Sequence, residues 1–457
     1  MIAAGCLSRE ALHGNFPCTD SGCSDFLAMK RVLVVLLAGG AGERLYPLTR
    51  ERAKPAVHFG GVYRIIDVTL SNCLNSNLRK IFILTQYKSL SLNRHIRLGW
   101  NILAPELDEF IEILPPMKRV SESWYMGTAD AVYQNIYSIL REDPEHVLIL
   151  AGDHIYKMDY SRMLRQHLES GAEVTVGTIP QPLGEAHHFG VIQEDSAGRI
   201  SGFVEKPKEG AERLTIAEGL ISASMGIYLF NTSTLLSALR DDAENPQSNH
   251  DFGRNVLPSI LGNRRVYSYH FLDENRKEAY YWRDVGTLDA YYEANMDLVA
   301  VSPVFNLYDR QWPIRTLQEQ YPPAKFVFAH GEGRMGVALD SIVSHGSIVS
   351  GGRVLRSVVS SGVRINSYAE VDSSILFPGV RVGRNSRLRQ CIVERNVQIP
   401  ENTYIGYDLE LDRLRGYTVT ESGIVVIAPG AAETDREGET VPESLRPGET
   451  RNGGSIS

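Results

Sequence analysis

Residues 32–45 read VLVVLLAGGAGERL, six aliphatic residues that pass directly into a glycine-rich turn. An uninterrupted apolar run of this length is typical of a strand that is buried on both faces. Runs at 81–85, 147–150 and 174–178 have the same character, and helical periodicity appears between them, as at 129–140. Alternating strands and helices predict a mostly parallel sheet with helices on both faces. Ligands of such sheets bind beyond the carboxyl ends of the strands, where the glycine-rich turn begins.

A different pattern follows residue 335. The segments DSIVSHGSIV, RSVVSSGVRI, SSILFPGVRV and QCIVERNVQI repeat one another, and their aliphatic positions Ile342, Val358, Ile375 and Ile392 are 16, 17 and 17 residues apart. Each repeat divides into three short faces with an inward aliphatic residue, which predicts a parallel β-helix whose coils bury a core by stacking. A generic run of edge strands is the alternative, and it accounts less well for four matched repeats.

Length and composition limit the kind of protein. The chain has 457 residues, 43% of them hydrophobic and 22% charged, with a net charge of -8. These values predict a globular protein of two or three domains. The charge and the absence of a basic run argue against a nucleic-acid partner. No secretory signal and no run long enough to cross a bilayer is found, so we expect no membrane partner and a cytoplasmic location.

These patterns divide the chain into five parts. The predicted divisions are a disordered N-terminal extension at 1–30, a catalytic domain at 31–300, a linker at 301–334, a β-helix at 335–428 and a disordered tail at 429–457. Whether residues 1–28 belong to the native protein is left open, since Met29 directly precedes the first credible strand.

The turn after the first strand has the character of a phosphate-binding loop. Gly39, Gly40 and Gly42 let backbone amides approach a phosphate or a base without side-chain obstruction. Arg44 and Lys54 follow and add positive charge suited to a triphosphate. A glycine-rich turn alone is equally typical of a tight structural turn, and this one matches neither a Walker loop nor a dinucleotide fingerprint.

Two acidic residues stand where a divalent cation could bind. Asp153 directly follows the buried run at 147–150, and Asp284 lies in the aromatic-flanked segment YYWRDVGT. Two carboxylates that share one Mg²⁺ with phosphate oxygens suit phosphoryl chemistry. A capping or loop hydrogen bond is the alternative role for Asp153. In GFVEKPKEG, Glu205 and Lys206 could bind sugar hydroxyls and a sugar phosphate, although a solvated ion pair explains them equally well when they are taken alone.

Taken together, these segments resemble the bacterial glucose-1-phosphate adenylyltransferase family, also called ADP-glucose pyrophosphorylases, over residues 32–406. The glycine-rich turn and EKP are shared by sugar-phosphate nucleotidylyltransferases in general. WYMGTADA, LAGDHIYKMDY and DRQWPIRT are narrower and point to the adenylyl enzymes, and AKPAVHFGG, HFGVI, ASMGIYLF, HDFGRNVLP and YWRDVGT belong to the same match. The resemblance implies a Rossmann-like nucleotidyltransferase domain followed by a left-handed β-helix.

The resemblance also implies roles for single residues. Glucose 1-phosphate would contact Tyr125, Gly190, Glu205, Lys206 and Ser224. The nucleotide would contact Gly39, Gly40, Gly42, Arg44, Lys54, Gly127 and Asp130. Asp153 and Asp284 would hold Mg²⁺, and Asp153, Lys206, Arg44 and Lys54 would carry catalysis. Gln86 and Trp124 would couple a regulatory site to the substrate site.

Two positions depart from the family pattern. Ala41 stands where many relatives have arginine, which removes one possible phosphate contact. Glu51 stands where enteric relatives have an activator-binding lysine, so the charge is reversed and the identity of the activator is open.

The expected reaction is ATP plus α-D-glucose 1-phosphate giving ADP-glucose and pyrophosphate, for glycogen (α-glucan) synthesis, in an allosterically regulated homotetramer. A nucleotidylyltransferase for another NTP and a catalytically silent regulatory subunit are the alternatives, and retention of Asp153, Lys206 and Asp284 argues against the second. Acyl transfer in the β-helix would need a longer helix and a positioned histidine, and His345 is the only histidine in the repeats. Anionic metabolites are the expected effectors. A basic cluster that could bind them consists of Arg381, Arg384, Arg387 and Arg389, and a solvated basic face explains this cluster equally well.

Overall fold

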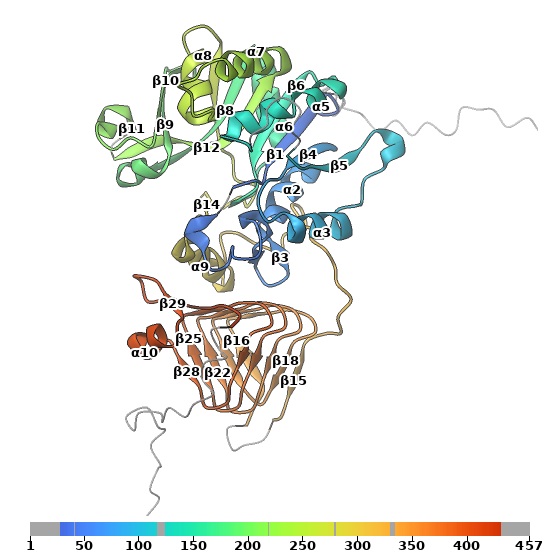
Figure 1. Ribbon diagram of the computed structural model, residues 1–457, viewed down its shortest axis with the longest axis vertical. Helices are drawn as coiled ribbons and strands as arrows, with labels where there is room; N and C mark the ends of the chain where they lie inside the picture. The colour runs from blue at the N-terminus through green and yellow to red at the C-terminus, as the bar shows by residue number, and fades with distance from the viewer. Residues whose placement is uncertain are drawn as a thin grey trace, which may run out of the picture.

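The computed structural model describes residues 28–40, 42–116, 124–217, 219–277, 280–329 and 334–430. They form an α/β part and a β-helix that lies below it in Figure 1, with helix α9 (Leu288–Met296) between the two. Ala41, most of the expected N-terminal extension and nearly all of the expected C-terminal tail lie outside the described residues. Within those ranges, no helix is both long and apolar enough to span a bilayer.

A ten-stranded sheet organises the α/β part. Its main path runs β10-β9-β12-β6-β1-β4-β5; β8 and β11 pair with β12, and β13 pairs with β8. Strands β6, β1, β4 and β5 are parallel, as expected, and β12 is antiparallel to β6, β8 and β9. The strands are β1 (Val32–Leu37), β4 (Lys80–Leu84), β5 (Phe110–Leu114), β6 (His146–Ala151), β8 (Val174–Pro182), β9 (Gly190–Glu194), β10 (Ile200–Glu205), β11 (Thr215–Ala217), β12 (Leu220–Asn231) and β13 (Val266–His270).

Both faces of this sheet are covered by helices. Strand β1 sends Val34 and Leu36 into one core and Leu33 and Val35 into the other, because successive side chains of a strand point to opposite faces. The first core includes α2 (Ile65–Asn75), α3 (Leu90–Gly99) and α6 (Tyr160–Glu169). The second includes α4 (Thr128–Gln134), α5 (Ile136–Arg141), α7 (Thr232–Ala243) and α8 (Leu257–Ile260).

The periodic segment at 129–140 forms two helices rather than one. The break falls at Asn135, whose side-chain amide donates to Ala131 O at 2.8 Å and to the Tyr125 hydroxyl at 2.8 Å. An asparagine side chain that bonds to the backbone competes with helical hydrogen bonds, and apolar periodicity does not reveal this. The interruption brings Tyr125 against the helix.

The second part is the expected left-handed parallel β-helix. The repeat positions Ile342, Val358, Ile375 and Ile392 pair in register, one coil above the next. Its first sheet holds β15 (Lys325–Val327), β18 (Ile348–Ser350), β21 (Arg364–Ile365), β24 (Arg381–Val382) and β27 (Gln398–Ile399). The second holds β16 (Val337–Leu339), β19 (Arg353–Leu355), β22 (Glu370–Asp372), β25 (Arg387–Arg389) and β28 (Tyr404–Ile405). The third holds β17 (Ile342–Val343), β20 (Val358–Val359), β23 (Ile375–Leu376), β26 (Cys391–Val393), β30 (Val425–Ile427) and β29 (Thr418–Val419), beside the short helix α10 (Leu409–Leu414).

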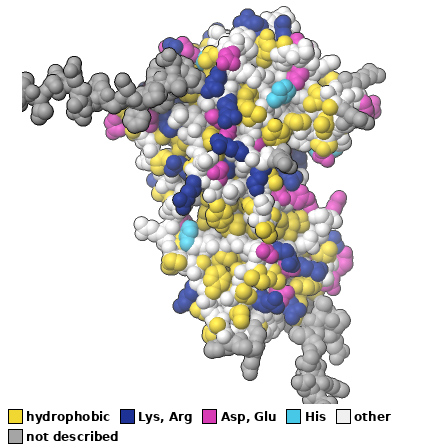
Figure 2. Space-filling view, turned by 180° about the vertical axis from the view of Figure 1, so that it is seen from behind, with side chains coloured by type: hydrophobic (Ala, Val, Ile, Leu, Met, Phe, Trp, Pro, Cys, Tyr) yellow, Lys and Arg dark blue, Asp and Glu magenta, His cyan; other side chains and the backbone are white. Residues whose placement is uncertain are grey.

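The two parts share one hydrophobic core. It joins Leu45 and Leu48 of the α/β part to Val358 and Ile375 of the β-helix. Such a core resembles the interior of a single domain more than a contact between mobile domains. On the face drawn in Figure 2, Lys and Arg side chains lie among acidic and apolar side chains over both parts.

Polar side chains of α2 hold the connection between the parts. Asp67, which is fully buried, accepts from Thr316 Oγ1 at 2.6 Å, and Ser71 Oγ accepts from Arg315 N at 2.8 Å. Asn72 Oδ1 accepts from Trp312 Nε1 at 2.8 Å. The segment that carries WPIRT is therefore fixed against the α/β part.

Candidate active site

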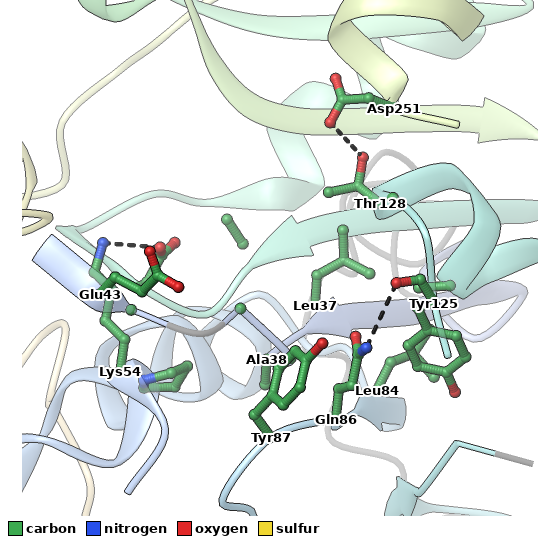
Figure 3. A pocket seen from close by; sticks show the side chains of 18 of the residues that line it. Leu37, Ala38, Glu43, Lys54, Leu84, Gln86, Tyr87, Tyr125, Thr128 and Asp251 are labelled. Carbon is green, nitrogen blue, oxygen red and sulfur yellow. Dashed lines mark hydrogen bonds and ion pairs between the residues drawn. The ribbon is translucent and has the colours of Figure 1, made fainter. Parts of the chain in front are cut away.

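A cavity of about 620 Å³ opens at the carboxyl ends of β1, β4 and β6. The glycine-rich turn forms one side of the cavity, and the segment at 125–128 forms another (Figure 3). Expected site residues that line it are Gly39, Gly40, Gly42, Arg44, Lys54, Gln86, Tyr125, Gly127 and Asp153.

The glycine-rich turn has a backbone that other residues would disturb. Gly42 has φ 66°, in the left-handed region that favours glycine, and its carbonyl accepts from Thr49 Oγ1 at 2.9 Å. A Cβ at Gly39 would come within 3.1 Å of Gln86 Cβ. Glycine is therefore the residue that fits at positions 39 and 42.

Lys54 lies between the two acidic residues predicted to hold a metal. Its Nζ is 2.8 Å from Asp153 Oδ2 and 2.9 Å from Asp284 Oδ1. Asp284 comes close because β14 (Trp282–Asp284) pairs antiparallel with β7 (His154–Tyr156), which sets Asp284 opposite His154. The sequence predicted both carboxylates but not that one lysine would join them.

The surroundings of Lys54 and Asp153 shift the pKa values of both groups. Burial opposes the charge on Asp153, but the Lys54 ammonium and its hydrogen bond hold the pKa of this carboxyl well below its usual range. Burial also opposes the charge on Lys54, and the two carboxylates outweigh it and raise the pKa of Lys54. Both side chains are therefore charged at neutral pH.

The same carboxylates fit a divalent cation. Ligand atoms of Asp153, His154 and Asp284 all lie within 4.8 Å of one another. Two carboxylates give hard oxygen ligands and leave room for phosphate oxygens and water, which matches the preference of Mg²⁺. Arg44 borders the group, since a Cβ at Gly286 would lie 3.0 Å from both Arg44 Nη2 and Asp284 Oδ1.

Two of the residues expected to bind the sugar phosphate, Gly190 and Lys206, lie beside Glu205. Strand pairing sets Glu205 opposite Gly190, where a Cβ would lie 2.8 Å from Glu205 Oε2. Lys206 Nζ is 3.7 Å from Glu205 Oε1 and is half exposed. Burial raises the pKa of Glu205 above its ordinary value, against the lowering effect of Lys206. A second cavity, of about 780 Å³, is lined by Glu205, Lys206, His187, Lys208 and Arg254, so cations outnumber the acid there.

Two other predicted residues have different surroundings. Asp130 is 7% exposed and lies beneath the turn at 125–128, where its Oδ2 accepts from Met126 N and Gln134 Nε2, both at 2.8 Å. Ser224 lies on β12 and accepts from Gly226 N at 3.3 Å. Asp130 therefore supports the turn, while Ser224 sits in the sheet.

Gln86 and Trp124 both lie beside the cavity. The Gln86 side-chain amide donates to Tyr125 O at 3.5 Å, as Figure 3 shows. The Trp124 ring stacks on Tyr87, with ring centroids 6.2 Å apart and an interplanar angle of 17°. Both predicted coupling residues thus contact the edge of the candidate site.

Sequence reasoning assigned no role to the segment HDFGR, although it quoted this motif. Asp251 Oδ2 accepts from Thr128 Oγ1 at 3.0 Å at the wall of the first cavity (Figure 3), and Gly253 lies against Glu205. The signal available in the sequence was Gly253, which follows His250, Asp251 and Phe252.

This fold and site are those of a nucleotidyl transferase, and similarity to known protein families agrees with this class. The Nucleotidyl transferase family matches residues 33–300, and the GlmU-like C-terminal hexapeptide family matches residues 322–427.

Similar curated proteins are glucose-1-phosphate adenylyltransferases. The protein of Koribacter versatilis is 66% identical over 87% of this chain and 95% of its own length. That of Rhodopirellula baltica is 58% identical over 88% and 91%, and that of an Anaeromyxobacter species 51% over 87% and 98%. The chain belongs to the glucose-1-phosphate adenylyltransferase family.

Proposed function

We propose that this chain transfers the adenylyl group of ATP to α-D-glucose 1-phosphate and releases pyrophosphate, which supplies ADP-glucose for glycogen (α-glucan) synthesis. The arrangement of Lys54 between Asp153 and Asp284, beside a glycine-rich turn, carries this proposal. Positive charge and hard oxygen ligands stand where a triphosphate would lie, and family membership supports both substrates.

The sugar phosphate supplies its own nucleophile. A phosphate monoester has a second pKa of about 6 and is mostly a dianion at neutral pH. One of its oxygens attacks the α-phosphorus of ATP, and the bond to the oxygen that bridges the α- and β-phosphorus breaks. Pyrophosphate leaves with that electron pair, and no protein base is required.

The residues of the chain would therefore act by positioning and by neutralising charge. The turn with Gly39, Gly40 and Gly42 would cradle the triphosphate, with Arg44 and Lys54 beside it. On the other side Lys206 would bind the sugar phosphate, while Glu205 would accept hydrogen bonds from sugar hydroxyls. Gly127, Asp130, Tyr125, Gly190 and Ser224 would complete the two substrate sites, as the family resemblance implies.

Asp153 and Asp284 would hold Mg²⁺. When bound, this ion supplies charge neutralisation on the phosphate oxygens and fixes their orientation.

Regulation by an anionic metabolite is part of the proposal. Arg52 on the segment that leads to Lys54 makes a buried ion pair with Glu394 of the β-helix, which offers a path between the two parts. Gln86 and Trp124 would act at the edge of the nucleotide site. In the basic cluster on the β-helix, Arg387 and Arg389 stand opposite Glu370 and Asp372 of the preceding coil in the strand register. The homotetramer stays a prediction that light scattering can check.

Pyrophosphate release from each nucleoside triphosphate, with glucose 1-phosphate and Mg²⁺, tests the proposed reaction. We expect a strong preference for ATP, with ADP-glucose as the product, and a panel of sugar phosphates and pyruvate would identify the activator. Preference for another nucleotide would assign the chain to a different nucleotidylyltransferase. A folded protein without turnover would indicate a regulatory subunit.

A further inference from the structure

One segment contacts both halves of the candidate site. Residues 248–256, here called the bridge, connect α7 to α8 and include the single-turn π-helix Phe252–Val256. Such turns are rare and occur frequently at functional sites. The bridge is far in sequence from both substrate-binding segments, so only the tertiary structure shows its place.

The nucleotide side of the bridge fixes the start of α4. The His250 carbonyl accepts from Ala129 N at 2.8 Å and from Asp130 N at 3.3 Å, so it satisfies two amides at the helix N-terminus. Gly127 passes so close that a Cβ there would overlap the His250 carbonyl. The Thr128 hydroxyl donates to Asp251 at 3.0 Å. The position of the turn at 127–130 therefore depends on the position of the bridge.

The sugar side of the bridge supports Glu205. A Cβ at Gly253 would lie 2.7 Å from Glu205 Oε2 and 3.2 Å from Glu205 Cδ. The carboxylate thus packs directly on the bridge backbone, and movement of the bridge would move the carboxylate.

A buried pair outside both substrate sites holds the bridge in place. Asp242 Oδ2 is 2.8 Å from His250 Nδ1, and Asp242 Oδ1 accepts from Ser248 Oγ at 2.6 Å. The Asp242 and His250 side chains are 7% and 12% exposed. Ser248 Oγ in turn accepts from His250 N at 2.9 Å. All three groups bond to one another rather than to the cavity.

The pair also stabilises a conformation that its residues would otherwise disfavour. His250 has φ 54°, a left-handed conformation that is uncommon for residues other than glycine. Asp242 lies in the last turn of α7, where a negative charge opposes the helix dipole. The hydrogen bonds between them compensate for both costs, and they fix the direction of the His250 carbonyl.

We propose that Asp242 and His250 are positioning residues that set, through the bridge, the geometry of the nucleotide turn and of Glu205 together. This inference rests on the proposed function, since it takes the turn at 127–130 and Glu205 as parts of the two substrate sites. It predicts that damage to a pair that touches neither substrate weakens both substrates.

The test measures two dissociation constants by calorimetry on the full chain with Mg²⁺. One is for ATP, and the other is for glucose 1-phosphate in the presence of an ATP analogue with a methylene group between the α- and β-phosphorus, which cannot react. The variants are His250→Ala, Asp242→Ala and His250→Asn. Asparagine tolerates the left-handed conformation and places an amide donor where Nδ1 stands. Asp241→Ala, at an exposed neighbour on the same helix, removes the same charge.

We expect His250→Ala and Asp242→Ala to raise both dissociation constants about tenfold, the loss that a charge-assisted hydrogen bond would give. His250→Asn should stay within about threefold of the parent, and Asp241→Ala should not differ from it. Thermal unfolding defines a temperature at which every variant is folded, so a loss of stability alone cannot imitate the result.

Two results would overturn the inference. One is an alanine variant, folded at the assay temperature, that keeps both dissociation constants within about twofold of the parent. The other is His250→Asn weakened as much as His250→Ala, since the donor would then be irrelevant. Failure of the proposed function would show differently, as a parent chain that binds both ligands without releasing pyrophosphate.

Discussion

Lys54 illustrates how single residues set the chemistry of this site. Its ammonium lies 2.8 Å from one carboxylate and 2.9 Å from another, contributed by positions 99 and 230 residues away in the chain. The ammonium bonds to both carboxylates and so fixes their positions before substrates arrive. The site is thus prepared for a polyanion and for a cation.

Asp153→Asn should lower turnover at least about a hundredfold, because an amide is a poor ligand for Mg²⁺ and withdraws charge where phosphoryl groups react. The fold should be kept, since Lys54 retains Asp284. Pyrophosphate release measures the first effect and circular dichroism the second. Near-normal activity in a folded variant would remove Asp153 from the metal site.

Acid should destabilise the parent protein more than it destabilises the Asp153→Asn variant. The folded pKa of Asp153 is lowered, so its ionised form stabilises the fold above the unfolded pKa of about 4, and this contribution is lost as the pH falls towards the folded pKa. The free energy of unfolding, measured by urea denaturation, should therefore fall more steeply in the parent between about pH 5 and about pH 2. Parallel curves would contradict the ion pair.

At the scale of elements, the site is built where strand ends and loops meet. Strands β1, β4 and β6 bring the glycine-rich turn, Gln86 and Asp153 to one edge, as a parallel arrangement requires. Strands β9 and β10 bring Gly190 to Glu205. The bridge contacts the turn at 127–130 on one side and Glu205 on the other.

Gly253→Ala should raise the KM for glucose 1-phosphate about tenfold and leave the KM for ATP within about twofold, because the new Cβ would displace the Glu205 carboxylate. Gly262→Ala is the matched control, since a Cβ there meets nothing within 4 Å. Steady-state kinetics with each substrate varied in turn distinguish the two. An equal rise for both substrates would argue against a selective role of Gly253.

In the molecule as a whole, the β-helix packs directly on the α/β part. The shared core and the buried Arg52–Glu394 pair, with Nη1–Oε1 at 2.8 Å, tie the two parts together two residues away from Lys54. Arg52 Nη1 also donates to Leu48 O at 3.3 Å. Arg52 thus links the β-helix to the segment that carries Lys54.

Glu394→Ala should lower the free energy of unfolding by about 3–5 kcal/mol, because it leaves a buried guanidinium without its partner. Glu410→Ala, which removes an 82%-exposed partner of Arg413, should change it by less than about 1 kcal/mol. Urea denaturation monitored by fluorescence checks both variants. Equal and small effects would mean that the Arg52–Glu394 pair does not stabilise the contact between the two parts.

The four buried strands, the stacking of the β-helix and the candidate residues Asp153, Asp284, Glu205 and Lys206 could all be predicted from the sequence. Burial leaves a periodic trace along the chain, so strands and coils can be recognised locally. The break at Asn135 was missed because it depends on a side-chain hydrogen bond and not on apolar spacing.

Which of these candidates lie close together became known from the folded structure alone. It placed Lys54 between two carboxylates, set Gly253 beneath Glu205, and joined Arg52 to Glu394 across 342 residues. Contacts of this kind arise when packed elements bring distant side chains together, and no local pattern records them. For the same reason the bridge, which the sequence showed only as a motif without a role, emerged from the fold.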